Sequence, residues 1–294
     1  PFILKMRHAF QTSKRLYIVT EFAKGGDLFD FLKKRGKPFT EQIVVRMAGE
    51  MLLALQHIHK LGVVYRDLKL ENVLLDVNGH IRIADFGLSK MLGKPRKSTE
   101  PGVLDDGGGY GQDQDIGMTR TFCGTREMIA PEALSGAAYG LSVDVWAFGI
   151  LVYETMAGRT PFYSKNRDEV YDRIESAPLR FPRHFSAEAV SLLRGLLDRN
   201  PKTRLGMGSD GLDAVKRHPF FRTVDWDGLY NMEPHPDNID VVGTLGLPDR
   251  GQKQAIKKPS ANSAAGREIA DVLSAEDEAG AARGSKQNLF SRFS

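Results

Sequence analysis

The stretch that decides the fold is Tyr65-Arg66-Asp67-Leu68-Lys69-Leu70-Glu71-Asn72, which lies between two short apolar runs. Asp85-Phe86-Gly87 begins thirteen residues after Asn72, and Ala130-Pro131-Glu132 comes later in the chain. The six fixed positions of Arg-Asp-Leu-Lys-x-Glu-Asn occur together by chance on the order of once in ten million starting positions at average residue usage. An ordinary ionic loop between two strands is therefore a poor explanation, and we interpret the three motifs as parts of one chemical site.

The three motifs resemble the signature set of eukaryotic-type serine/threonine protein kinases, with Tyr65 in place of the usual histidine. By this resemblance Asp67 is the catalytic base, and Lys69 offsets the charge of the phosphoryl group in transfer. Asn72 and Asp85 offer the hard oxygen ligands that Mg2+ prefers. The resemblance implies an enzyme that uses ATP and Mg2+. It also implies an α+β protein kinase fold, with a mostly helical C-lobe and a remnant of the β-rich N-lobe.

Further motifs resemble the AGC group of protein kinases, and the ribosomal-protein kinase branch in particular. The resemblance runs from Pro1 to about Pro236 and thins beyond it. Its group-level motifs are Tyr65-Arg66-Asp67, Thr121-Phe122-Cys123-Gly124-Thr125, Asp144-Val145-Trp146-Ala147-Phe148-Gly149, Asn200-Pro201-Lys202-Thr203-Arg204-Leu205-Gly206 and His218-Pro219-Phe220-Phe221.

The resemblance assigns an adenine pocket near the start of the chain. Thr20 is expected to be the gatekeeper, Glu21 and Ala23 to offer hinge backbone groups, and Leu74 to lie under the ring. Asp27 is expected to meet either the ribose or a basic substrate residue. The full set expected to bind ATP is Thr20, Glu21, Ala23, Asp27, Glu71, Asn72, Leu74 and Asp85, of which Asn72 and Asp85 are the Mg2+ ligands.

Protein substrates with arginine upstream of a Ser or Thr acceptor follow from the same resemblance. The family reads basic residues at the positions of Asp27, Glu71 and Glu154, and the planar guanidinium of arginine pairs bidentately with a carboxylate. Four further residues are expected to support the site: Thr125 braces Asp67, Asp144 holds the catalytic-loop backbone, and Glu132 pairs with Arg204. A weak surface ion pair is the alternative for Glu132 and Arg204.

Regulation is expected in the activation segment. Thr121 resembles the activation-loop phosphorylation site, and Arg66 and Lys90 are placed to meet the added charge. An ordinary exposed threonine is the alternative. The chain ends in Phe290-Ser291-Arg292-Phe293-Ser294, which resembles the hydrophobic motif of the AGC tail and makes Ser294 a second candidate phosphorylation site.

Two features depart from the family pattern. Arg126 and Met128 stand where the family usually has proline or an aliphatic residue and tyrosine, respectively, in the loop that shapes the subsite after the acceptor. The activation segment also carries an insertion at about 94–118. Its run Gly107–Gly111 is not a phosphate loop, because no strand precedes it and no helix follows it.

The chain divides by composition and pattern. Residues 1–22 are expected to end the N-lobe sheet and enter the hinge, and 23–221 to form the C-lobe. The activation segment spans 85–132 with its flexible insert at 94–118, and 222–294 is expected to be an AGC-type C-terminal tail, largely disordered. Strands are predicted at Phe2–Leu4, Leu16–Val19, Val63–Tyr65, Val73–Leu75 and Ile81–Ile83, with an Asn78-Gly79 turn, and helices at Asp27–Lys34, from Thr40 to Gly62, and over much of 130–220.

Bulk properties fit a signalling enzyme of this kind. The net charge of +4 in 294 residues is too small to argue for nucleic acid, and the single cysteine, Cys123, excludes an internal disulfide. No segment is apolar for long enough to span a membrane. We expect a cytoplasmic monomer, possible also in the nucleus, that an upstream kinase activates.

The glycine-rich phosphate loop and the strand lysine of kinases do not occur in the sequence, and we expect them upstream of Pro1. The alternative is a pseudokinase scaffold that lacks them. Intact Asp67, Lys69, Asn72 and Asp85 argue against the scaffold, which has no chemical need of all four residues.

Overall fold

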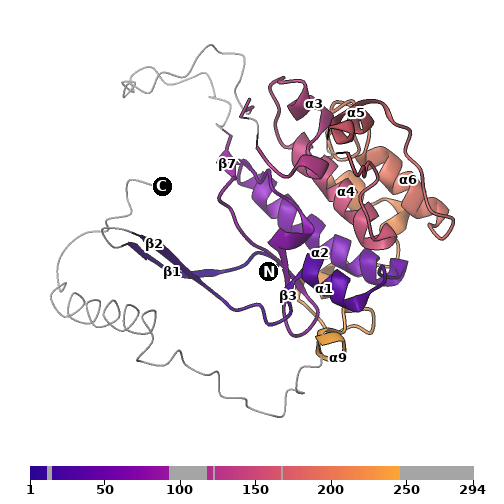
Figure 1. Ribbon diagram of the computed structural model, residues 1–294. Helices are drawn as coiled ribbons and strands as arrows, with labels where there is room; N and C mark the ends of the chain where they lie inside the picture. The colour runs from indigo at the N-terminus through magenta and orange to yellow at the C-terminus, as the bar shows by residue number, and fades with distance from the viewer. Residues whose placement is uncertain (12–14, 93–117, 122, 167, 246–294) are drawn as a thin grey trace. The chain divides into compact units, whose positions relative to one another are not determined.

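The computed structural model describes residues 1–11, 15–92, 118–121, 123–166 and 168–245 (Figure 1). The chain forms two compact units, Pro1–Leu247 and Pro248–Ser294, and the second lies outside the described residues. The first unit combines short antiparallel strands with a helical body, which is the α+β architecture that the sequence predicts. Among the described helices, none is both long and apolar enough to cross a membrane.

The first strands form a hairpin in which β1 (Met6–Gln11) pairs antiparallel with β2 (Leu16–Thr20) (Figure 1). The prediction of a strand at Phe2–Leu4 is wrong. The side chain of Phe2 is fully buried in the main core, and Ile3 makes only an isolated bridge to Ile83 of a later strand. Apolar residues at the start of the chain therefore serve packing, and the paired strand begins after them.

Two small sheets hold the loops of the site. β3 (Gly26–Asp27), β5 (Val73–Leu75) and β6 (Ile81–Ile83) form an antiparallel sheet in the order β3-β5-β6. β4 (Val63–Val64) pairs with β7 (Lys90–Met91). These pairings confirm the strands predicted at Val73–Leu75 and Ile81–Ile83, and they place the segment between β4 and β5 beside the segment that follows β6.

Helix α2 (Glu41–Lys60) follows its sequence signals closely. Phe39 and Val44, on either side of the N-cap Thr40, are both buried, as expected for a hydrophobic staple. Gly62 has a φ of 72°, a left-handed conformation that favours glycine after a helix. The other helical elements are α1 (Leu28–Arg35), η1 (Leu70–Asn72), η2 (Arg126–Met128), α3 (Pro131–Leu134), α4 (Ser142–Ala157), α5 (Glu169–Ser176), α6 (Ala187–Leu196), α7 (Leu212–Lys216), η3 (Pro219–Phe221), α8 (Trp226–Tyr230) and α9 (Val241–Leu245).

Helix α4 lies at the centre of the helical body. It packs against both α2 and α6, and nearly all of its side chains are buried, so it shows no polar face. Phe148 belongs to the main core, whereas Trp146 lies in a second cluster and stacks on Phe162 at 5.8 Å between ring centroids. Because α4 contributes to both clusters, it is a rigid support for the loop that contains Tyr65 and Arg66.

The segment after residue 221 belongs to the first unit as far as residue 245. Ile239 and Val241 are buried in the main core, and the backbone of Ile239 lies against the turn between β5 and β6. A Cβ atom built on Gly79, whose φ is 81°, would lie 2.1 Å from the Ile239 carbonyl oxygen. The part of the predicted tail at 222–245 is thus packed, and 246–294 lies outside the described residues.

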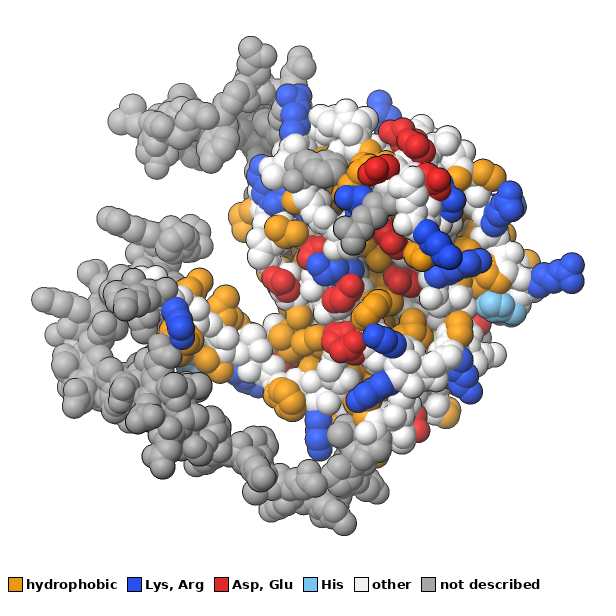
Figure 2. All heavy atoms as spheres, viewed as in Figure 1, with side chains coloured by type: hydrophobic (Ala, Val, Ile, Leu, Met, Phe, Trp, Pro, Cys, Tyr) orange, Lys and Arg blue, Asp and Glu red, His pale blue; other side chains and the backbone are white. Residues whose placement is uncertain are grey.

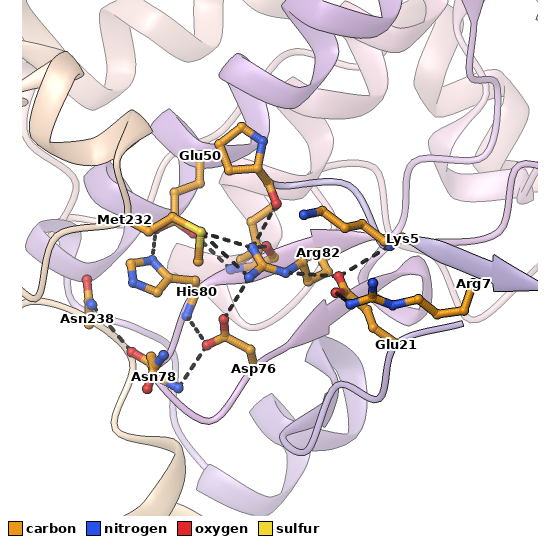
Figure 3. A network of polar contacts seen from close by, with 12 residues as sticks. Lys5, Arg7, Glu21, Glu50, Asp76, Asn78, His80, Arg82, Met232 and Asn238 are labelled. Carbon is orange, nitrogen blue, oxygen red and sulfur yellow. Dashed lines mark hydrogen bonds and ion pairs between the residues drawn. The ribbon is translucent and has the colours of Figure 1, made fainter. Parts of the chain in front are cut away.

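Arg82 of β6 contacts four separate parts of the chain (Figure 3). Its guanidinium donates to the carbonyl of Pro1 at 2.9 Å and to Asp76 at 3.1 Å. It also approaches the Met232 sulfur at 3.5 Å and Glu21 at 3.4 Å. Glu21 leads from β2 to β3, so this network fixes the hinge segment to the β5–β6 turn and to the segment after α8.

Candidate active site

The Asp67 carboxylate is held by three side chains. Oδ2 accepts from Lys69 Nζ at 2.7 Å and from Asn72 Nδ2 at 2.8 Å, and Oδ1 accepts from Thr125 Oγ1 at 3.3 Å. Asp67 is 6% exposed. These contacts bring together the predicted base, the predicted charge-offsetting lysine, a predicted metal ligand and the predicted brace. A carboxylate held in this way has a fixed direction, as a general base requires.

The backbone under Asp67 is tied to helix α4 by one buried carboxylate. Asp144 accepts from the backbone N–H of Tyr65 and of Arg66, each at 2.8 Å, and from His59 Nε2 at 2.8 Å. Arg66 has a φ of 71°, which is uncommon for a residue other than glycine. Asp144 therefore fixes the backbone conformation of the residues just before Asp67, the role that the resemblance implies for it.

Asp85 lies at the surface after β6, with a φ of 54° and its Oδ1 accepting from Gly87 N at 3.0 Å. The pKa of the Tyr65 hydroxyl is raised, first by burial and then by the charges of Asp67 and Asp85. Both carboxylates therefore lie near the same tyrosine. Phe86 packs its ring edge-on to Tyr65 at 5.1 Å, which couples the two motifs.

This arrangement suits a magnesium site in its donor chemistry. Asp85 offers an exposed carboxylate, and the amide nitrogen of Asn72 is used by Asp67, so the Asn72 amide oxygen is the atom left for a cation. Mg2+ is commonly held by one or two protein oxygens together with substrate phosphates.

The hinge segment offers two backbone groups. The Glu21 N–H donates to the Lys5 carbonyl at 3.0 Å, and the Ala23 carbonyl accepts from Gly26 N at 3.2 Å. Over the residues that the structure describes, the Glu21 carbonyl and the Ala23 N–H make no hydrogen bond with the protein. These are one acceptor and one donor, the pair that an adenine edge would use. Thr20 ends β2 beside them, and half-buried Leu74 lies opposite Asp27 in the β3–β5 ladder.

Three glutamates, Glu71, Glu127 and Glu154, line a pocket of about 330 Å3, which we call the acid pocket; Arg126 also lines it, so acids outnumber basic residues there. Glu127 accepts from Thr160 Oγ1 at 2.6 Å, whereas Glu154 Oε2 is buried with no hydrogen-bond partner in the described part of the chain. Burial raises the pKa of Glu154 to about 8, and the charges of Glu127 and Glu71 add to the effect. In Figure 2 acidic side chains gather near the middle of the visible face. An acidic pocket with an unpartnered carboxylate is a site for a cation.

Asp27, the third predicted substrate-binding acid, does not line the acid pocket. It is the N-cap of α1, and its Oδ1 accepts from Asp30 N at 2.8 Å. It lines a separate pocket with Lys24, Lys33 and Lys34. One of its oxygens is thus used by the helix, and lysines share its surroundings.

The predicted regulatory residues form a connected group. Lys90 Nζ donates to Thr119 Oγ1 at 3.0 Å, and Thr119 Oγ1 lies 3.4 Å from the hydroxyl of exposed Thr121. The Tyr139 hydroxyl donates to the Thr121 carbonyl. Arg66 donates through Nε to the Leu88 carbonyl, and its Nη1 is buried with no partner in the described residues. Unused donors beside a threonine are what an added phosphate would need. Ser294 and the insert at 94–117 lie outside the described residues.

Glu132 and Arg204 form a buried bidentate pair. Nη1 and Nη2 of Arg204 donate to the two carboxylate oxygens of Glu132 at 2.6 and 2.8 Å. Arg204 also donates to the carbonyls of Ser142 and Asp198, and its guanidinium lies 5.1 Å from the centre of the Trp146 ring. With Arg204 only 1% exposed, a weak surface ion pair does not describe this contact.

Comparisons with known proteins agree with the geometry. The family described as the protein kinase domain matches residues 1–221. The chain belongs to the protein kinase family. Within it the chain is similar to the ribosomal protein S6 kinases of the AGC group. Ribosomal protein S6 kinase alpha-2 is 46% identical over 243 residues in Mus musculus and 45% in Homo sapiens; in each case the match covers 83% of this chain and 30% of the relative. Ribosomal protein S6 kinase alpha-6 of Danio rerio is 44% identical over 236 residues, which is 80% of this chain and 29% of the relative.

The chain thus spans about 30% of the length of these kinases. One residue of the kinase site was missed from the sequence, namely Glu127 of the acid pocket. It lies next to Arg126 in the loop after Thr125. No local pattern predicts that it shares a pocket with Glu154, which lies on helix α4. A search for acids within the activation segment would have found it.

Proposed function

We propose that the chain carries the catalytic machinery of a serine/threonine protein kinase that phosphorylates proteins next to basic residues. The observation that carries the proposal is the Asp67 carboxylate, held by Lys69, Asn72 and Thr125 within the same region as Asp85. The pseudokinase alternative receives no support, since all four polar residues of the reaction are present.

Each of these residues has a chemical task in the proposal. Asp67 accepts the proton of the Ser or Thr hydroxyl, and its hydrogen bonds keep the accepting oxygen directed at the incoming group. Lys69 is 22% exposed and bonded to Asp67, so its ammonium can offset negative charge that develops beside the base. Thr125, in the activation segment, makes the direction of Asp67 depend on how that segment is folded.

ATP and Mg2+ would be held by the hinge and by the two predicted metal ligands. The Glu21 carbonyl and the Ala23 N–H would bind adenine, with Leu74 and the gatekeeper Thr20 lining its pocket, while Asp85 and Asn72 would coordinate the metal. When bound, Mg2+ and ATP supply the phosphoryl group and neutralise the charge on its oxygens.

The acid pocket supports a preference for arginine in the substrate. Glu154 has an unpartnered buried oxygen, and Glu71 and Glu127 add two more carboxylates, so a guanidinium can make bidentate contacts there. Asp27 would contribute from outside this pocket, either to the ribose or to a second basic residue.

Two substitutions test the chemistry in the full-length protein. Asp67→Asn and Asp85→Asn should each abolish phosphorylation of an arginine-containing peptide, and Asp85→Asn should weaken binding of Mg-ATP more than Asp67→Asn does. Asp168→Asn, an exposed acid before α5, is the matched control. Near-normal turnover in either variant would remove the assignment.

We also propose that an upstream kinase phosphorylates Thr121 and that Arg66 and Lys90 pair with the phosphate, with Ser294 as a second site. Thr121→Ala should lower kcat, and protein that is fully active without phosphate at Thr121 would contradict this. The proposal includes a cytoplasmic, and also nuclear, monomer, which fractionation and sedimentation would test.

A further inference from the structure

A second polar pocket lies next to the acid pocket and has the opposite charge. It encloses about 410 Å3 between the loop after α4 and the segment around α5. We call it the arginine pocket, because its lining includes Arg159, Arg173 and Arg180, together with Tyr153, Thr160 and Tyr163. Among the described lining residues there is no Asp or Glu.

Two of the three guanidinium groups form no ion pair with a carboxylate of the described residues. Arg173 pairs with Glu169 at 3.0 Å and donates to the Tyr163 carbonyl. Arg159 and Arg180 are exposed, and neither forms an ion pair with any carboxylate in the described ranges. Two arginine forks that no carboxylate of the described chain neutralises favour an anion from outside.

Contacts around Tyr153 bring Arg159 and Arg180 to one place. The Tyr153 hydroxyl donates to the backbone carbonyl of Arg180 at 2.8 Å. Burial raises the pKa of this hydroxyl and the charge of Arg159 lowers it, and Arg159 lines the same pocket as Tyr153. Two residues that are 21 positions apart in the sequence (180 − 159) therefore approach the same buried tyrosine.

The two pockets are joined through one hydrogen bond. Thr160 lines the arginine pocket, is 4% exposed and donates its hydroxyl to Glu127 of the acid pocket at 2.6 Å. Arg159 is the residue just before Thr160 in the chain. A polyanion such as nucleic acid would meet the carboxylates of Glu71, Glu127 and Glu154 beside the arginines, whereas a polypeptide with charges of both signs would match both pockets.

We propose that the arginine pocket is a second substrate subsite, which binds a carboxylate or phosphate group of the same polypeptide whose basic residue occupies the acid pocket. The inference rests on the proposed kinase function and adds to it a requirement for mixed charge. A good substrate would carry an acidic or already phosphorylated residue at a fixed separation from its arginine.

A peptide series on the full-length protein tests this. Each peptide keeps one arginine and one serine acceptor, while Glu, phosphoserine or Gln is moved through the remaining positions. At one position we expect Glu or phosphoserine to lower KM by about tenfold relative to Gln, as two bidentate arginine contacts allow. The residue, Glu or phosphoserine, that gives the lower KM identifies the natural anion.

Substitution then assigns the effect. Arg159→Gln with Arg180→Gln should raise the KM of the anionic peptide to that of the Gln peptide, and Arg159→Glu with Arg180→Glu should move the preference to Lys at the same position. Arg183→Gln, an exposed arginine outside the pocket, should keep the wild-type preference.

Three outcomes would overturn the subsite. They are a series with no preferred position for an anion, a preference that survives both double variants, and inhibition by inorganic phosphate without any peptide preference. In each, turnover of the Gln peptide leaves the kinase function standing. If no arginine-containing peptide is phosphorylated at all, the proposed function fails and the subsite fails with it.

Discussion

At the scale of single residues, Glu154 of the acid pocket is unusual because its Oε2 is buried without a hydrogen-bond partner in the described structure. Its pKa of about 8 is due first to burial, and then to Glu127 and Glu71. Below that pKa the carboxyl group is mostly neutral and above it mostly charged. Only the charged form pairs strongly with a guanidinium, which keeps its proton over this whole range.

Peptide binding should therefore strengthen as pH rises through 8. The ionised fraction of a group with this pKa increases about tenfold between pH 7 and pH 9, so the Kd of an arginine-containing peptide should fall by up to about tenfold. Calorimetry across this range measures it. Glu154→Gln, which has the same shape and no titration, should flatten the profile. A wild-type Kd that does not change with pH would contradict the assignment of a cation to this pocket.

The buried pair of Glu132 and Arg204 should be costly to break. Glu132→Ala leaves Arg204 charged and buried, for which a loss of about 3–5 kcal/mol in the free energy of unfolding is typical. Urea unfolding of the two proteins measures the difference. Glu188→Ala removes the exposed pair with Arg222 and should leave the urea midpoint near the wild-type value. Equal effects of the two substitutions would show that burial is not the cause.

At the scale of elements, the turn between β5 and β6 is fixed by what packs on it. Gly79 has both a positive φ and the backbone of Ile239 at its α carbon. Gly136 has a similar φ of 71° but no atom within 4 Å of a Cβ built there. The two glycines therefore separate the cost of backbone conformation from the cost of a clash.

Gly136→Ala should cost about 1–2 kcal/mol, the usual price of a left-handed conformation for an L-residue. Gly79→Ala should cost distinctly more, because Ile239 and its neighbours must move away from the core. Thermal and urea unfolding give both values. Proteolysis between α8 and α9 should also become faster in Gly79→Ala only. If the two variants are equally stable, the contact of Ile239 with this turn does not contribute to the cost of the Gly79 substitution.

Local patterns predicted those elements whose signals are local. Short apolar runs on either side of the Asn78-Gly79 turn were enough for β5 and β6, and the apolar spacing after Thr40 was enough for α2. The strand predicted at Phe2–Leu4 failed because a run of apolar residues does not tell whether they pair or fill a core. Burial of Phe2 depends on residues far along the chain, and no local pattern carries that information.

At the scale of the whole first unit, apolar side chains are unevenly distributed between core and surface. The helical body buries most of its described large apolar residues, whereas Leu16 and Ile18 of the β1–β2 hairpin are 69% and 61% exposed. Phe22, just after β2, is 84% exposed. Neither β1 nor β2 pairs with another strand in the described residues, so each presents a free edge.

The 294-residue chain by itself should therefore self-associate through this hairpin. Leu16→Thr with Ile18→Thr keeps residues that favour strands and removes the apolar surface, so it should shift the chain towards monomer in light scattering and sedimentation. Leu61→Thr, which is equally exposed on the helical body at 57%, is the control. If Leu61→Thr reduces self-association and the double variant does not, the self-associating surface lies on the helical body and not on the hairpin.

The site was predicted in part, and the limit has a physical origin. Asp67, Lys69 and Asn72 lie within six positions and meet through a single loop, so their proximity could be read from the motif. Glu127 and Glu154 come from a loop and from a helix, and only the packing of α4 brings them together. Arg159 and Arg180 likewise come together only through packing, around Tyr153, which belongs to none of the sequence motifs.

Asp144 has a consequence in time as well as in space. Loop amides usually exchange their hydrogens with water within seconds to minutes, because loops open by themselves. The amides of Tyr65 and Arg66 are instead held by a carboxylate with no exposed surface, on helix α4, whose side chains are nearly all buried. They can exchange only when α4 separates from the loop, so deuterium should enter these two positions as slowly as it enters the helix. Asp144→Asn should return them to the rate of their neighbours.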